Sequence, residues 1–117
     1  MKEIIALVRR EKTKATKQKL ADQGFIPCTE KQILGRGKQL GLHYPEGESR
    51  PWPSLGIPFL PKCMLTIFVN DEEVNRVVEI LVDSNRTGEI GDGKIFVIDL
   101  PRCIRIRTGD EGSQAIG

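Results

Sequence analysis

The sequence predicts an α+β domain with the element order β-α-β-β-α-β, and three observations lead to this expectation. Apolar runs typical of strands lie at 3–8, 60–69 and 95–100. A capped helix pattern with one apolar face begins at Asn70. A segment rich in Lys, Gln and Ala before Gly24 predicts the other helix. The 117 residues are enough for one domain.

The first half of the chain predicts a strand, a helix and a strand. Residues 3–8 form a short apolar run of the kind found in buried strands. Residues 12–23 favour a mostly exposed helix, because the apolar stripe is thin, and Gly24 is a natural helix stop. A second strand is expected at 25–34, because turn residues follow it.

The second half begins with a strand at 60–69, where β-favouring residues are concentrated. Asn70 can then cap a helix, and Glu73 stands at the reciprocal position of a capping box. Gly88 can end this helix. The apolar residues at helical spacing between them are Val74, Val77, Val78 and Leu81.

Two more strands are expected near the end of the chain, at 95–100 and around 104–107. The principal elements therefore form two βαβ halves, which is the ferredoxin-like arrangement.

The strand expected at 60–69 is apolar on both faces. Cys63, Leu65, Ile67 and Val69 alternate with Met64, Thr66 and Phe68. One layer of two helices covers only one face of a four-stranded sheet. Self-association would cover the other face, and we expect an oligomer. The alternative is an exposed apolar surface without a partner.

The composition excludes several classes of protein. The net charge of +2 implies no particular partner. No apolar run approaches the ~20 residues that cross a bilayer. Cys28, Cys63 and Cys103 are scattered and odd in number, so they indicate no disulfide framework and favour a reducing cytoplasm. Each is expected to be a small buried residue.

The most informative segment for function is 87–94, which holds three glycines. Such a turn can direct several N–H groups at one anion, and Lys94 adds a positive charge. Further on, Arg105 and Arg107 would share one face of the strand expected there. Together they predict a phosphate site, and a nucleotide is the expected ligand. The alternative is a surface turn followed by an exposed strand face.

A long loop at 42–58 contains four prolines and shows no periodicity. Loops of this length in a small domain are usually functional or disordered. Trp52 lies between two prolines and is a candidate anchor for a protein partner. The alternative is that it folds back onto its own domain. His43 is the only histidine and is expected to be solvated.

Four segments resemble the PII signal-transduction proteins of nitrogen metabolism, in the order that this family shows. The resemblance runs from Met1 to about Gly109, interrupted only by the loop. It implies a single domain at 1–117, with an effector loop at about 37–58 and a C-terminal tail at about 109–117. The matching segments are 35–39, 59–62, 87–97 and 104–109.

The resemblance implies a homotrimer that binds ATP or ADP between subunits, and 2-oxoglutarate together with Mg-ATP. The residues that match nucleotide contacts are Thr29, Gly37, Lys38, Phe68, Gly91, Asp92, Gly93, Lys94, Arg105 and Arg107. Those that match 2-oxoglutarate contacts are Arg9, Gln39, Gly41 and Lys62, and Gln39 also matches the magnesium ligand. Magnesium prefers oxygen ligands, and a dicarboxylate needs cations, so the residue types suit these roles.

The loop departs from the bacterial pattern. Leu55 falls where many relatives carry a tyrosine that is uridylylated, and Tyr44 matches that position poorly. Leu40 replaces a common lysine. The Gly-Arg-Gly-Lys-Gln base at 35–39 and the absence of this tyrosine resemble the branch encoded beside nitrogenase genes. Members of that branch act on dinitrogenase, often as a pair of two PII-like chains. A second branch of the family plugs an ammonium channel, and the residue chemistry specifies neither target.

Two other functions compete with that of a regulator. An ATP-using enzyme needs a general base or nucleophile near the phosphates. Asp92 is the single candidate for such a group, which is weak support for an enzyme. An RNA-binding sheet of this type stacks bases on exposed aromatic residues, but only 5% of this chain is aromatic. The sequence therefore favours a regulator that is neither an enzyme nor a nucleic-acid-binding protein.

Overall fold

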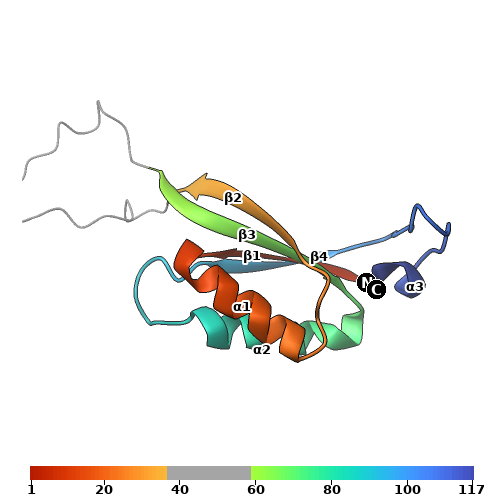
Figure 1. The fold of residues 1–117 in the computed structure, drawn as a ribbon, viewed down its shortest axis with the longest axis horizontal. Coiled ribbons are helices and arrows are strands. Elements are labelled where there is room, and N and C mark those ends of the chain that lie inside the picture. The colour runs from red at the N-terminus through yellow and green to blue at the C-terminus, as the bar shows by residue number, and fades with distance from the viewer. Residues whose placement is uncertain (37–58) are drawn as a thin grey trace, which may run out of the picture.

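The computed structural model describes residues 1–36 and 59–117 of the chain (Figure 1). The strands pair antiparallel in the order β2-β3-β1-β4. This is the ferredoxin-like α+β arrangement, so the predicted fold class is confirmed. The elements are β1 (Lys2–Val8), α1 (Arg10–Asp22), β2 (Thr29–Gly35), β3 (Leu60–Val69), the 3₁₀ turn η1 (Asp71–Glu73), α2 (Val74–Asn85), β4 (Lys94–Asp99) and α3 (Ser113–Ile116).

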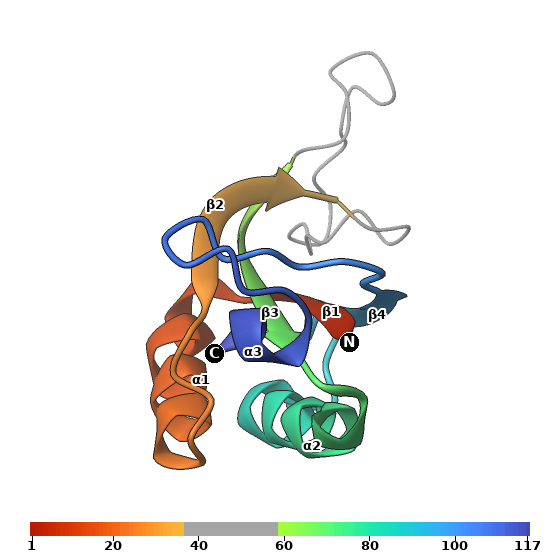
Figure 2. The same cartoon turned by 90° about the vertical axis from the view of Figure 1, so that its right-hand side faces the viewer.

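The helices α1 and α2 lie side by side on one face of the sheet (Figure 2). Because side chains alternate along a strand, every second residue of β1 and β3 points into the space between sheet and helices. These residues form one continuous apolar core with the inner faces of the two helices. The core consists of Ile4, Ala6, Val8, Leu20, Cys63, Leu65, Ile67, Val69, Val77, Ile80 and Leu81.

The opposite face of the sheet carries large apolar side chains that no other part of the described chain buries. Phe96 is 45% exposed and Ile98 is 42% exposed on β4, and Phe68 is 40% exposed on β3. The strand register aligns them, since Phe68 and Ile98 both lie opposite Glu3 on the central strand β1. The alternation predicted for β3 is therefore present, and this bare face is the surface on which an oligomer is expected.

The start of the second helical segment confirms the predicted capping box. The Glu73 carboxylate accepts a bond from the Asn70 backbone N–H at 3.1 Å, and both halves of the box are present. The predicted end was wrong, because α2 stops at Asn85 rather than at Gly88. Arg86 is already extended, and the amides of the next two residues are bonded to Asp92, so the helix cannot continue.

Other boundaries also differ from the sequence prediction, and β1 begins at Lys2 rather than at residue 3. The first helix begins at Arg10, two residues before the predicted start at 12. The second strand begins at Thr29 instead of 25, because the Phe25 N–H is bonded to the Leu20 carbonyl and the chain is still leaving the helix there. The fourth strand is displaced by one residue from the predicted 95–100 and begins at Lys94.

The predicted C-terminal strand at 104–107 was wrong. Ile104 makes only an isolated bridge with Glu111, and the chain turns at 106–108. The Gly109 N–H bonds to the Arg105 carbonyl and closes that turn. The chain then ends in the short helix α3, which the sequence pattern did not predict. The two arginines therefore do not share a strand face.

The cysteine prediction is confirmed for Cys63, which is fully buried, whereas Cys28 and Cys103 are only half-buried. All three thiols lie in the described residues and are free. No helix in the described ranges is long and apolar enough to cross a membrane. The predictions for the loop at 42–58, including His43 and Trp52, fall outside the described residues.

Candidate anion-binding site

The turn between α2 and β4 is organised around the Asp92 carboxylate. It accepts bonds from the Thr87 N–H at 2.8 Å, the Thr87 hydroxyl at 2.5 Å and the Gly88 N–H at 2.9 Å. Arg9, which directly follows β1, donates a fourth bond at 2.7 Å. A carboxylate with this many donors fixes the turn against the sheet, so Asp92 acts here as the internal anchor of the turn.

Gly93 lets the turn pass close to β1. Its φ is +108°, and a Cβ atom at this position would overlap the Leu7 carbonyl oxygen. Gly91 has a φ of +100°, and a Cβ atom there would lie 3.3 Å from the Arg9 guanidinium. At each of these two positions, a specific neighbouring atom therefore explains why the turn needs glycine.

Two cations lie against this turn. Arg9 Nη2 donates to the Ile90 carbonyl at 2.9 Å, and Lys62 Nζ donates to the Gly91 carbonyl at 2.5 Å. Lys62 belongs to β3, and Arg9 directly follows β1, whose last residue Val8 pairs with Cys63 of β3. Burial lowers the pKa of Lys62, and the nearby charge of Arg9 lowers it further. Because Arg9 is already paired with the Asp92 carboxylate, an anion bound here would add a partner for Lys62 and would share Arg9 with Asp92.

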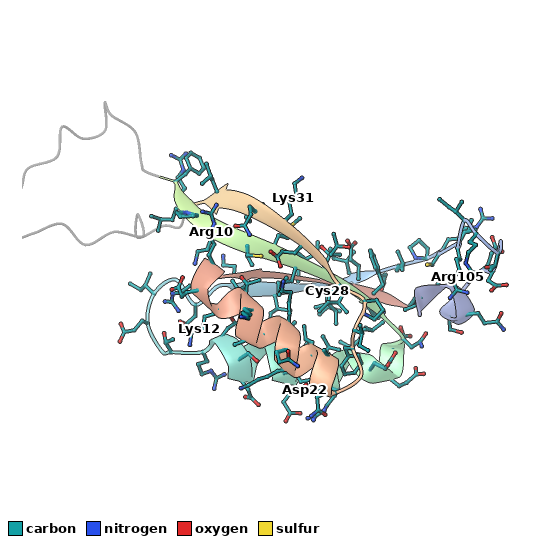
Figure 3. All side chains as sticks on the ribbon, in the orientation of Figure 1. Arg10, Lys12, Asp22, Cys28, Lys31 and Arg105 are labelled. Carbon is teal, nitrogen blue, oxygen red and sulfur yellow. The ribbon has the colours of Figure 1, made fainter. Side chains whose placement is uncertain are left out.

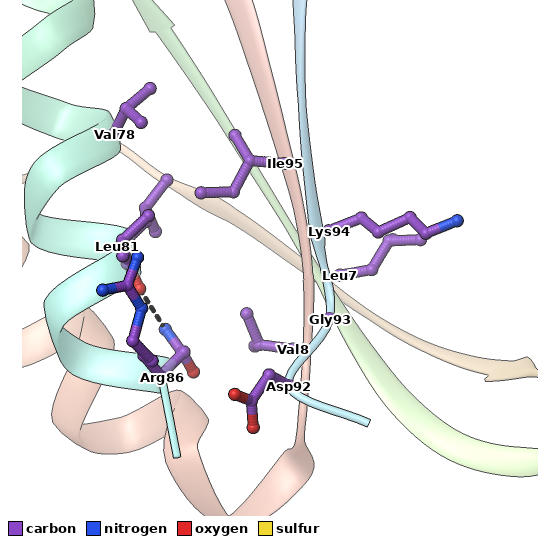
Figure 4. Close-up of a pocket in the computed structure, with 11 residues that line it drawn as sticks. Leu7, Val8, Val78, Leu81, Arg86, Asp92, Gly93, Lys94 and Ile95 are labelled. Carbon is purple, nitrogen blue, oxygen red and sulfur yellow. Dashed lines mark hydrogen bonds between the residues drawn. The ribbon is translucent and has the colours of Figure 1, made fainter. Parts of the chain in front are cut away.

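A pocket lies beside this turn, and Lys94 lines it while its side chain points away from α2. It has a volume of about 390 Å³ and lies between α2 and the ends of β1 and β4. Figure 4 shows Val78 and Leu81 of α2 on one side, with Val8 and Asp92 facing them. Lys94 points away from α2 in this view, so its ammonium group is available to a ligand on the other side of β4.

The predicted nucleotide residues form two separate groups within one chain. Lys94 pairs with Leu7 near one end of β1, whereas Phe68 pairs with Glu3 near the other end. Thr29 lies near Phe68 along the sheet, because its partner on β3 is Thr66, two residues before Phe68. A single chain therefore does not bring all these residues around one ligand.

The two arginines also lie far from the turn. In Figure 3, Arg105 is at the opposite end of the molecule from Arg10, which directly follows Arg9. The Arg105 guanidinium is bonded to the Gln114 and Gly117 main-chain oxygens and to Asp110. Arg107 is exposed. Thus the structure brings Arg9 and Lys62 together with the turn at 87–94, which we call the glycine turn. It does not bring Arg105 and Arg107 to that turn.

Sequence reasoning missed Thr87, which supplies two of the four bonds to Asp92. An Asp or Asn whose side chain binds nearby backbone amides is typical of turns, so Asp92 between two glycines was the available signal. The remaining predicted site residues, Gly37, Lys38, Gln39, Gly41 and Trp52, lie outside the described residues.

Asp92→Asn is expected to loosen the turn in a pH-dependent way. Hydrogen bonds from Thr87, first from its side chain and then from its backbone, together with Arg9, hold the pKa of Asp92 well below its usual range. The ionised carboxylate therefore stabilises the folded protein above the unfolded-state pKa of about 4, and this contribution is lost as the pH falls through the lower folded-state pKa.

The measurement is urea unfolding of the wild type and Asp92→Asn between neutral and acidic pH. The difference in unfolding free energy should be constant above pH about 4 and shrink below it. A difference that stays constant into the acid range would contradict the role given to the carboxylate.

The fold and the site together define a small α+β domain of ferredoxin-like topology, in which the glycine turn between α2 and β4 lies beside Arg9 and Lys62. A family model described as "Nitrogen regulatory protein P-II" matches residues 1–110. The chain therefore belongs to the PII family of nitrogen regulatory proteins.

Individual relatives agree with this assignment. The chain is 44% identical to "Nitrogen regulatory protein P-II 2" of Methanothermobacter thermautotrophicus, with 99% of this chain and 97% of the relative covered. It is 40% identical to "Nitrogen fixation nifHD1 region GlnB-like protein 2" of Methanosarcina barkeri, with 99% of each covered. A crystal structure of Arabidopsis thaliana PII bound to citrate superposes with a TM-score of 0.76 at 29% identity, covering 98% of this chain and 88% of that one.

Proposed function

We propose that this chain is a nitrogen-status regulator that binds ATP or ADP at sites completed by two neighbouring protomers of a homotrimer. The observation that carries the proposal is the division of the predicted phosphate ligands. The glycine turn and Lys94 lie at one end of β1, whereas Arg105 belongs to the other end of the molecule (Figure 3). A second copy of the chain can supply the missing arginines to the turn.

The proposal includes 2-oxoglutarate and Mg²⁺ as ligands of the same region. Arg9 and Lys62 are held together beside Gly91, and they offer two cations to a dicarboxylate. Gln39 would ligate magnesium by the family resemblance, and it lies outside the described residues. The citrate in the related Arabidopsis structure supports the view that carboxylate ligands suit this family.

The regulatory role, as opposed to an enzymatic one, is also part of the proposal. The family description and the names of the relatives are those of regulatory proteins. In addition, the Asp92 carboxylate already accepts four bonds that anchor its turn, so it is poorly placed to serve as a general base.

Isothermal titration of ATP and 2-oxoglutarate tests the ligands. Arg107→Ala is expected to weaken ATP binding by about tenfold or more, because a charge-assisted phosphate contact is lost. Gln39→Ala should spare ATP but remove the Mg²⁺-dependent binding of 2-oxoglutarate. Arg76→Ala is a matched control, because Arg76 pairs with Glu79 on the exposed surface of α2. No heat of binding with ATP, or retained magnesium dependence in Gln39→Ala, would contradict the proposal.

We propose dinitrogenase as the protein target, with the long loop as the contact and Trp52 as its anchor. The support is the set of relatives whose printed names place them in nifHD regions, including those of Methanosarcina barkeri and Methanothermobacter marburgensis. A second PII-like chain can share this task. An ammonium channel, or another nitrogen-assimilation protein, is the alternative target.

Affinity capture from nitrogen-starved cells tests the target. The wild type is expected to retain dinitrogenase without 2-oxoglutarate and to release it when 2-oxoglutarate and Mg-ATP are added, because the ligand would change the shape of the loop. Trp52→Ala should capture at least several-fold less while remaining trimeric. Capture of a membrane channel instead of dinitrogenase would overturn this target assignment.

A further inference from the structure

Arg105 is the candidate phosphate ligand whose guanidinium is already occupied by its own chain. Its Nη2 donates to the Gln114 main-chain oxygen at 2.7 Å and to the Gly117 main-chain oxygen at 3.0 Å. Its Nη1 lies 3.3 Å from the Asp110 carboxylate. The side chain is 29% exposed. The groups that a phosphate would bind are thus directed at residues 110–117, which we call the C-terminal segment.

The short helix α3 explains why this segment holds a guanidinium. The last carbonyl groups of a helix have no partner within the helix, and a cation at this end is favourable. Arg105 binds the oxygens of Gln114, within α3, and of Gly117, directly after it. A second set of contacts returns the segment to the chain before it, because the Gly112 N–H bonds to the Cys103 carbonyl and the Arg105 N–H bonds to the Asp110 carbonyl.

The C-terminal segment also lies beside a second predicted nucleotide contact. Ser113, Ile116 and Gly117 line a pocket of about 210 Å³ together with Phe68 of β3. The same segment therefore holds one predicted ligand and lies against another. Arg107, by contrast, is exposed and makes no hydrogen bond or ion pair to any residue in the ranges 1–36 and 59–117.

We infer that the C-terminal segment is an autoinhibitory latch that competes with nucleotide phosphates for Arg105. The inference rests on the proposed function, because it takes Arg105 as a phosphate ligand. Three of the five N–H donors of Arg105 are directed at the segment, so a phosphate that approaches both Nη groups competes with it. The latch is built to open, since a four-residue helix has little intrinsic stability. Nucleotide and closed latch are then linked in free energy, and each weakens the other.

The test uses Ala115→Pro in the full-length chain. The Ala115 N–H bonds to the Gly112 carbonyl at 2.9 Å, and proline removes this donor and disfavours the helical turn before it. Opening the latch should tighten ATP binding roughly fivefold in isothermal titration. Ala115→Ser keeps the backbone donor and is the matched control, with unchanged affinity expected.

Asp110→Asn gives a second, milder variant, because it weakens the contact with Nη1 and leaves α3 in place. It should also tighten ATP binding. Hydrogen exchange supplies a readout on the wild type, in which saturating ATP should speed exchange of the Ala115 amide by releasing the segment.

The outcomes separate the latch from the proposed function. If none of these proteins binds ATP, the nucleotide site itself is wrong and the latch falls with it. If all bind ATP with equal affinity, if Ala115→Pro and Asp110→Asn bind more weakly, or if ATP slows exchange at Ala115, the latch is wrong while the nucleotide site stands.

Discussion

Gly93→Ala is expected to destabilise the protein by about 3 kcal/mol and to abolish nucleotide binding. The new Cβ atom would overlap the Leu7 carbonyl oxygen, which is backbone within the central strand and has no freedom to rotate away. The backbone φ of +108° adds strain for any residue with a side chain. Either the turn must leave β1 or the sheet must shift.

Gly88→Ala is the matched control for this substitution. Gly88 belongs to the same turn and has a φ of +87°, but nothing lies within 4 Å of the position that its Cβ would take. It should therefore cost only the strain of the backbone conformation, about 1 kcal/mol. Urea unfolding gives both values, and ATP titration gives the effect on the site. Equal costs for the two substitutions would show that the contact with Leu7 does not decide the need for glycine.

The elements that the sequence predicted well are those with a strong local pattern. Leu60–Val69 is found with its predicted bounds, because β-favouring residues and alternation act together along its length. The capping box at Asn70 is equally local, since it depends on two residues three positions apart. The order of the elements then limits the sheet to few topologies, and the ferredoxin-like one is observed.

The C-terminal strand failed for a reason that a local pattern cannot show. The alternation in 104–107 has the period of a strand, but a strand also needs a partner for its backbone groups. In the described part of the chain, the Arg105 backbone instead bonds to Asp110 and Gly109. The alternation of residue types is real, but it does not indicate that the chain folds back on itself after Arg105.

The site was predicted in its residues but not in its contacts. The glycines, Arg9 and Lys62 were all singled out, yet nothing in the local sequence joins Arg9 to Asp92, which lies 83 positions later. That contact depends on the sheet, which places the end of β1 beside the start of β4. The same sheet fixes the Leu7 oxygen against Gly93. The sequence indicated only that glycine gives the backbone conformational freedom here, whereas the packing shows that a side chain would not fit.

Phe96→Asp is expected to convert the proposed trimer into single 13.1-kDa chains and to remove nucleotide binding with it. Phe96 lies opposite Ile5 on the bare face of the sheet, and its neighbours Phe68 and Ile98 are apolar and 40–42% exposed in the isolated chain. A carboxylate among these side chains would have to lose its water on assembly without an ion-pair partner, which is strongly unfavourable. Loss of ATP binding should follow, because the proposed site needs residues from two protomers.

Val97→Asp is the matched control, since Val97 is the next residue of β4, is 46% exposed and lies on the helix-covered face opposite Ile4. It introduces the same charge on the other side of the sheet and should leave the trimer intact in analytical ultracentrifugation. If Phe96→Asp stays trimeric, the bare face is not the interface. If it becomes monomeric and still binds ATP with full affinity, the site lies within one chain, and the division of the phosphate ligands between protomers is wrong.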